Sequence, residues 1–154
     1  MYHRIVEQKL RATFGDVNRG NYIPVVNGFA EQGLHWFSGT HALSGERSGP
    51  HDIARWYGRL ALLFPDLTFT IVEVAVRGWP WNTTAMVEWT DKLHDRKGVE
   101  FTNSGVHVVK LRWGKIVSLR IYCDTARLAM VLRTLAEQGV EEATKEPIIS
   151  RSRN

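Results

Sequence analysis

The chain has 154 residues, 44% of them hydrophobic, which is enough to bury the core of one domain. Its single cysteine, Cys123, excludes an internal disulfide framework and a cysteine-rich zinc site. The net charge of +4 argues little for nucleic-acid binding, because part of it falls in residues 145–154 and the other charges are interspersed in sign.

No membrane-spanning segment is expected. The first residues, MYHRIVEQKLRATFGD, mix charges with apolar positions, which is not the pattern of a secretory leader. No later apolar stretch is long enough to cross a bilayer. We therefore expect a protein of the cytoplasm, without membrane or nucleic-acid partners.

Three helices are predicted early in the chain, because apolar residues recur there every three or four positions. They cover residues 2–14, 21–32 and 50–64. The third is the best marked, since Pro50 fits the first helical position, Asp52 lies near the positive end of the helix dipole, and Pro65 ends it. A short strand over 34–37 and a loop over 38–49, rich in Gly, Ser and His, precede this helix.

After Pro65 the apolar period changes from helical to alternating, which predicts four strands rich in Val, Ile, Thr and Trp. They cover residues 68–77, 84–93, 99–113 and 115–124. Their connections are short enough for hairpins, so we expect an antiparallel sheet. A last helix is predicted over 125–138, and the domain over 1–139. Residues 140–154 have little periodicity and are expected to form a flexible tail.

This order, with helices first and strands after them, indicates an α+β fold rather than a parallel α/β fold. Strands of ten or more residues twist and coil, so the sheet is expected to curve strongly around the N-terminal helices. The predicted shape is a cone with a central pocket.

Two stretches of sequence resemble family signatures. The first, residues 48–67, reads SGPHDI, then Trp56, then FPDL. The second, residues 114–139, begins with GKIV, has Asp124 at the end of the last predicted strand, and ends in an LxxLxxxG pattern. In the order and spacing of these pieces the chain resembles the SnoaL-like members of the nuclear transport factor 2 superfamily, which have a ketosteroid isomerase-like fold.

The resemblance implies a pocket for a small hydrophobic ligand of the sterol, polyketide or terpenoid kind, without a metal or cofactor. It leaves the activity open, because the superfamily includes polyketide cyclases, ketosteroid isomerases, epoxide hydrolases and non-catalytic binding proteins. Family members commonly pair through the outer face of the sheet. A homodimer through that face, which would carry Glu88, Lys110, Arg120 and Tyr122, is therefore expected.

Strand alternation selects two polar residues on apolar, inward-facing sets, namely Asp91 and His107. Burial raises the pKa of a carboxyl group, and a neighbouring imidazole can share or take its proton, which suits general acid/base chemistry. The alternative is that both are core groups satisfied by each other, by backbone or by buried water. His35 is a third catalytic candidate, because it lies close to where the resemblance places the isomerase base.

Ligand contacts are predicted from aromatic and aliphatic residues on the expected pocket face. They are Trp36, Tyr57, Phe64, Trp89, Leu119 and Ile121. The resemblance places Ile121 where SnoaL-like cyclases carry their base, and isoleucine cannot accept a proton. This substitution favours a non-catalytic binding domain as the second hypothesis. The histidines lack the spacing that brings two imidazoles to one ion, so no metal is expected.

Overall fold

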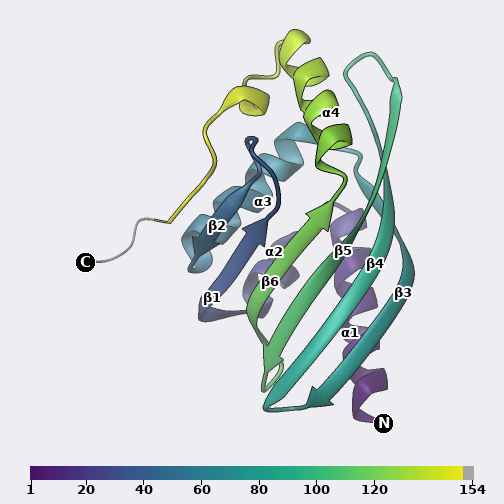
Figure 1. Ribbon diagram of the computed structural model, residues 1–154, viewed down its shortest axis with the longest axis vertical. Helices are drawn as coiled ribbons and strands as arrows, with labels where there is room; N and C mark the ends of the chain where they lie inside the picture. Colours follow the sequence, from purple (N-terminus) through teal and green to yellow (C-terminus); the bar gives the residue numbers. More distant parts are fainter. Residues whose placement is uncertain (151–154) are drawn as a thin grey trace.

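The structure is a computed structural model, and it describes residues 1–150. Its helices are α1 (Tyr2–Asn18), α2 (Ile23–Gly28), α3 (Pro50–Leu63) and α4 (Thr125–Glu137), followed by a 3-10 turn, Glu141–Thr144. Its strands are β1 (Phe29–Phe37), β2 (Gly45–Ser48), β3 (Thr68–Trp79), β4 (Asn82–His94), β5 (Glu100–Arg112) and β6 (Lys115–Cys123). Helices come before and after a long run of strands, so the fold is α+β, as predicted (Figure 1).

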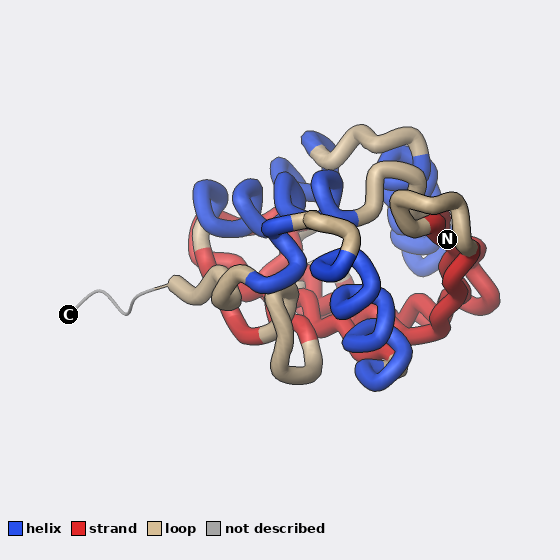
Figure 2. Tube along the Cα trace, turned by 90° about the horizontal axis from the view of Figure 1, so that it is seen from above, coloured by secondary structure: helices blue, strands red, loops and turns tan. Residues whose placement is uncertain are grey.

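Six strands form one curved sheet in the order β2-β1-β6-β5-β4-β3. The four long strands make the predicted antiparallel meander. The sheet is not antiparallel throughout, because β1 pairs with β6 in parallel. Parallel neighbours need a long crossover, and here α3 and four strands separate β1 from β6 in the chain. Figure 2 shows the strands as a curved layer with helices along its hollow side.

The second helix is shorter than predicted, because the chain turns into strand β1 at Phe29 instead of continuing as helix to residue 32. Phe29 pairs with Ile116 of β6, so pairing within the sheet overrides local helix propensity. Gly33 lies where this pairing changes register, and a Cβ there would be 2.7 Å from the Ile116 carbonyl oxygen. Strand β2, with the sequence GERS, lies within the predicted loop and carries no apolar alternation that would reveal it.

Helix α3 covers the hollow side of the sheet with its apolar stripe. Ile53, Trp56, Leu60 and Leu63 are buried, and they recur at the three- and four-residue spacing that one helix face requires. The indole Nε1 of Trp56 donates to the carbonyl of Leu43 at 2.8 Å, so the one polar atom of this side chain is satisfied in the core. The helix therefore forms one wall of the space enclosed by the sheet.

The segment that follows α4 is held by two buried arginines, although its composition predicts a flexible tail. The Arg59 Nε donates to Glu142 Oε2 at 3.0 Å, and the Arg47 Nε donates to the carbonyl of Ile148 at 2.8 Å. Ile148 itself is buried. Backbone carbonyls accept several of these hydrogen bonds, and a carbonyl leaves no mark in a sequence. The part of the predicted tail over 151–154 lies outside the described residues.

Candidate functional site

A pocket lies between the hollow face of the sheet and helices α1, α3 and α4, with a cavity volume of about 100 Å³. Its walls are mostly aromatic and aliphatic, with few polar atoms. The aromatic residues that line it include Phe14, Phe37, Tyr57, Phe64, Phe69 and Trp89. A cavity with so aromatic a lining favours an apolar ligand that carries rings.

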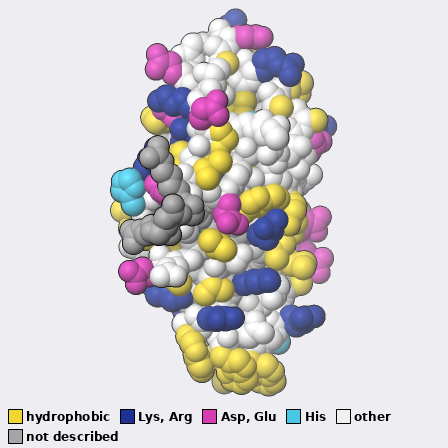
Figure 3. All heavy atoms as spheres, turned by 60° about the vertical axis from the view of Figure 1, so that its left-hand side comes forward, with side chains coloured by type: hydrophobic (Ala, Val, Ile, Leu, Met, Phe, Trp, Pro, Cys, Tyr) yellow, Lys and Arg dark blue, Asp and Glu magenta, His cyan; other side chains and the backbone are white. Residues whose placement is uncertain are grey.

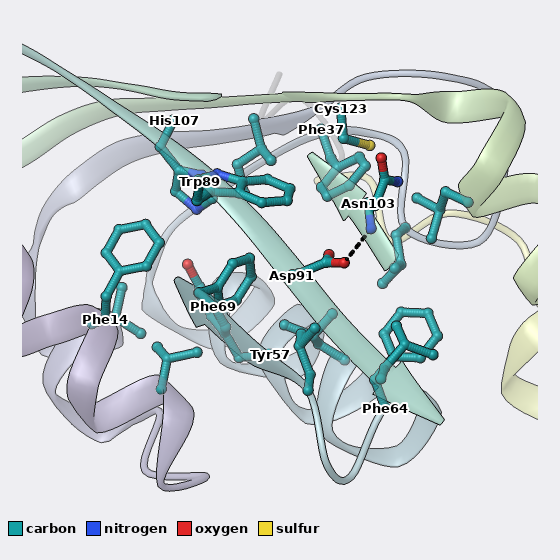
Figure 4. A pocket seen from close by; sticks show the side chains of 18 of the residues that line it. Phe14, Phe37, Tyr57, Phe64, Phe69, Trp89, Asp91, Asn103, His107 and Cys123 are labelled. Carbon is teal, nitrogen blue, oxygen red and sulfur yellow. Dashed lines mark hydrogen bonds between the residues drawn. The ribbon is translucent and has the colours of Figure 1, made fainter. Parts of the chain in front are cut away.

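Asp91 brings a carboxylate into this apolar wall (Figure 4). One oxygen, Oδ1, accepts a hydrogen bond from the backbone N–H of Asn103 at 2.8 Å. The other, Oδ2, has no hydrogen-bond partner within residues 1–150. Burial raises the pKa of Asp91 to about 6, and the Asn103 N–H only partly offsets that rise by stabilising the charge. The carboxyl group therefore titrates close to neutral pH and keeps one oxygen free for a ligand.

His107 is held as a neutral imidazole with a defined tautomer. The indole Nε1 of Trp89 donates to His107 Nδ1 at 2.7 Å. An indole N–H can only donate, so Nδ1 is the acceptor and the ring proton sits on Nε2. Burial lowers the pKa of His107 to about 3, which keeps the ring uncharged. The Nε2–H has no partner within residues 1–150 and is available to an acceptor on a ligand.

A glycine on the neighbouring strand allows the indole of Trp89 to reach the histidine. Gly105 lies opposite Trp89 on β5. A Cβ at that position would stand 2.6 Å from the Trp89 ring and 2.2 Å from the Tyr122 carbonyl oxygen. Only a residue without a side chain lets the indole lie against β5 and turn its Nε1 toward His107.

Asp91 and His107 line the same pocket, as strand alternation predicts, but they do not hydrogen bond to each other. Asp91 lies opposite Asn103, whereas His107 lies opposite Val87, four residues back along β4. At about 3.3 Å per residue, this offset is roughly 13 Å along the strand. Trp89 fills the space between them in Figure 4. Direct proton sharing between the two side chains is therefore not part of this geometry.

His35, the third catalytic candidate, is fully buried beside the pocket but not among its lining residues. Arg47 Nη1 donates to His35 Nδ1 at 2.8 Å, which leaves the proton on a buried Nε2 without a hydrogen-bond partner. Burial, with the nearby Arg47 charge, holds the pKa of His35 well below its ordinary value. Its ring packs on Trp56 at 4.2 Å between centroids. These contacts support a structural role for His35.

Five of the six predicted ligand contacts line the pocket, namely Tyr57, Phe64, Trp89, Leu119 and Ile121. Trp36 does not, because alternation along β1 turns it to the opposite face from His35 and Phe37. It packs there against Arg120, whose guanidinium carbon is 3.9 Å from the indole ring centre. The prediction that Trp36 contacts a ligand is thus not supported by its position.

Three further residues at the site were not selected from the sequence. Asn103 acts through its backbone N–H, which any residue except proline supplies, so only the register of the β4–β5 hairpin reveals it. Cys123 lines the pocket near Asp91, and burial, together with that carboxylate, raises the pKa of its thiol to about 11. Arg127 reaches the pocket from the first turn of α4, where it is largely exposed.

Among residues 1–150, no three His, Cys, Asp or Glu side chains come together as a metal site would require. In the same residues, no helix has both the length and the apolar character needed to cross a bilayer.

Comparison with protein families matches residues 10–119 to the SnoaL-like domain. No curated protein matches the sequence. Among solved structures, an NTF2-like protein of unknown function from Burkholderia pseudomallei is 17% identical, with 81% of this chain and 95% of that chain covered and a TM-score of 0.70.

Two other similar structures are those of a ligand complex and of a candidate polyketide cyclase. TerC, co-crystallised with polyporic acid, is 15% identical, with 80% of this chain and 95% of that chain covered and a TM-score of 0.67. IdmH of Streptomyces antibioticus, a candidate polyketide cyclase, is 12% identical, with 82% of this chain and 97% of that chain covered and a TM-score of 0.66. Identities this low show a shared fold and leave the activity to be argued from the site.

Proposed function

Because this chain belongs to the SnoaL-like domain family of the nuclear transport factor 2 superfamily, we propose that it binds a small, flat hydrophobic ligand. The proposed ligand is of the sterol, polyketide or terpenoid kind, and it exchanges a proton with Asp91. The observation that carries the proposal is Asp91 itself. It places a carboxyl group with a pKa of about 6 and one unpartnered oxygen in an apolar pocket.

The pKa of Asp91 fits proton transfer in both directions. At pH 7 a group with a pKa of about 6 is mostly ionised, and about one molecule in ten carries the proton. The carboxylate takes a proton from a carbon next to a ligand carbonyl, and the electron pair of that C–H bond moves into the carbonyl group as an enolate. The carboxylic acid then returns the proton to another position of the ligand, so the reaction consumes no cofactor.

His107 supplies the second polar contact. The Trp89 hydrogen bond fixes the tautomer that carries a proton on Nε2. This Nε2–H is a neutral hydrogen-bond donor, because the low pKa keeps the ring uncharged. It suits a carbonyl or hydroxyl oxygen on the part of the ligand far from Asp91. A separation of roughly 13 Å along the strand calls for an extended ring system, which agrees with the aromatic lining of the pocket.

Non-catalytic binding is the second candidate function, and Ile121 favours it. Ile121 is buried in the pocket wall at the position where the resemblance to SnoaL-like cyclases places a base. If that position is required, the pocket binds its ligand without reaction. Asp91 then serves as a hydrogen-bond partner for a ligand hydroxyl group.

Deuterium exchange separates the two functions. A panel of polycyclic ketones and hydroxyquinones is incubated with the protein in deuterium oxide, binding is followed by quenching of tryptophan fluorescence, and exchange is followed by mass spectrometry. We expect the wild type to bind at least one ring class and exchange its acidic C–H. The Asp91→Asn variant should bind it but lose exchange, and Glu88→Gln, on the outer face of the same strand, should match the wild type.

Binding without exchange in the wild type would establish the non-catalytic function. The absence of binding to every ring class would overturn the proposal as a whole.

We also propose a homodimer through the outer face of the sheet and a cytoplasmic location. Half-exposed Met86 and partly exposed Tyr122 lie on that face and would be covered by a second copy. The single free cysteine agrees with a reducing compartment. Sedimentation that gives only a 17.6 kDa species at micromolar concentration would contradict the dimer.

A further inference from the structure

Three tryptophans project from one end of the molecule, at the tips of two neighbouring hairpins. Trp79 ends β3 and is 64% exposed, Trp81 lies in the β3–β4 turn and is 54% exposed, and Trp113, in the β5–β6 turn, is 73% exposed. The Trp79 and Trp81 rings are nearly parallel with centroids 5.9 Å apart, and Trp81 lies 6.1 Å from Trp113. We call these three residues the tryptophan tip.

The backbone holds the tip in this form. The Trp113 N–H donates to the Pro80 carbonyl at 2.6 Å, which ties the two turns together. Trp113 and Gly114 both have positive φ, 50° and 78°, as a two-residue hairpin of this kind requires. Asparagine and glycine suit such positions, whereas a bulky aromatic residue is disfavoured there. Trp113 adopts a disfavoured backbone conformation, and its mostly exposed side chain adds little to the core. We therefore expect the indole to have a role at the surface.

The charged residues on the two hairpins are all basic over residues 74–87 and 101–123, next to the tip. Arg4, Arg77, Arg112 and Lys115 are exposed on the segments that meet at this end. No aspartate or glutamate occurs in residues 1–6, 74–87 or 101–123. Figure 3 shows hydrophobic side chains gathered at the lower end of the molecule, with Lys and Arg side chains directly above them. This combination favours a partner that is anionic and has an apolar layer.

We propose that the tryptophan tip binds the surface of an anionic lipid bilayer. Indole rings favour the boundary between headgroups and acyl chains, and cationic side chains just behind them are attracted to anionic headgroups. The tip projects from the end of the sheet, so it can enter a flat interface without a change of fold. This is attachment to one leaflet by two turns, which needs no spanning helix, and it replaces the expectation that the protein has no membrane partner.

Two other partners fit the tip less well. A second copy of the chain docked tip to tip would bring the four cations of one molecule against those of the other. Single-stranded nucleic acid binds in basic grooves that follow its backbone, whereas these rings project from two turns at the end of the sheet. A bilayer satisfies the apolar rings and the cations together.

Vesicle binding tests the proposal with the full-length protein. Co-sedimentation is measured with vesicles of phosphatidylcholine alone and with an equimolar mixture of phosphatidylcholine and phosphatidylglycerol, at low and high salt. We expect binding to the anionic vesicles that weakens with salt, and little binding to the neutral ones. Equal binding to both vesicle types, or none to either, would overturn the proposal.

Matched variants locate the contact. Trp113→Asn keeps a residue that accepts positive φ, so it removes the indole while preserving the turn, and we expect about tenfold weaker vesicle binding with no loss of thermal stability. Arg112→Gln should weaken binding about fivefold. Lys97→Gln, an exposed cation in the β4–β5 turn, should have no effect.

The same variants exclude the other partners. Wild-type binding by the Trp113→Asn variant would overturn the lipid proposal. A tighter, Trp113-dependent association with an oligonucleotide, or with a second copy in sedimentation, would likewise replace it.

Discussion

Replacing Asp91 by asparagine is expected to stabilise the fold at neutral pH while removing proton exchange. The folded pKa of Asp91 is about 6, above its ordinary value of 3.8, because burial penalises the charged form. A raised acid pKa means that the native state binds a proton more tightly than the unfolded state does. Stability from this group is therefore complete below about pH 4 and is lost as the pH rises through 6.

The shift from 3.8 to about 6 corresponds to at most about 3 kcal/mol, at about 1.4 kcal/mol per pKa unit, and to about 2 kcal/mol once partial solvent contact is allowed for. Asparagine keeps an oxygen for the Asn103 N–H but carries no charge. Asp91→Asn should therefore match the wild type near pH 4 and exceed it by about 2 kcal/mol at pH 8.

Urea unfolding at a series of pH values measures this difference directly, with Glu88→Gln as the control. Buried His107 contributes the opposite slope, because its lowered pKa removes stability as the pH falls. That contribution is common to both proteins and cancels in the difference. A difference that does not change with pH, or one that favours the wild type at pH 8, would refute the reasoning.

Three other substitutions test the framework of the site. Trp89→Phe leaves His107 Nδ1 without its donor and should cost about 1–3 kcal/mol, with nitrogen NMR showing that the Nε2–H tautomer loses its dominance; an unchanged tautomer would contradict the assignment. Gly105→Ala drives a Cβ into the Trp89 ring and the neighbouring strand and should cost about 3 kcal/mol, measured by thermal unfolding, whereas a neutral result would mean that the strands separate freely. Arg47→Met removes three buried hydrogen bonds and should cost about 3 kcal/mol while hydrogen exchange rises across residues 141–150; unchanged protection there would show that the segment is held by other contacts.

The features that follow from periodicity are predictable from this sequence. Alternation over β4 and β5 predicts that Asp91 and His107 share one face, and both line the pocket. Helix α3 is found almost as predicted, because Pro50 and Pro65 mark its two ends. These features depend on local residue types, which a sequence displays directly.

The features that depend on contacts between distant segments are not predictable in the same way. The distance between Asp91 and His107 follows from the register of the β4–β5 hairpin, and the placement of Trp36 follows from where β1 begins. The hydrogen bond from Trp89 to His107 depends on the lack of a side chain at Gly105. In the sequence, a glycine at this position indicates only a weak strand former. The anchoring of residues 141–150 rests in part on the carbonyls of Glu146 and Ile148, and every residue possesses a carbonyl.

The central claim is that an apolar pocket holds Asp91 ready to exchange a proton with a flat hydrophobic ligand. Carbon-13 NMR titration of the Asp91 side-chain carboxyl, assigned by comparison with Asp91→Asn, tests it most directly. The account predicts a midpoint near pH 6 in the free protein and a higher one when a ring compound fills the pocket and removes more water. A midpoint near 4 that does not respond to any ligand would contradict it.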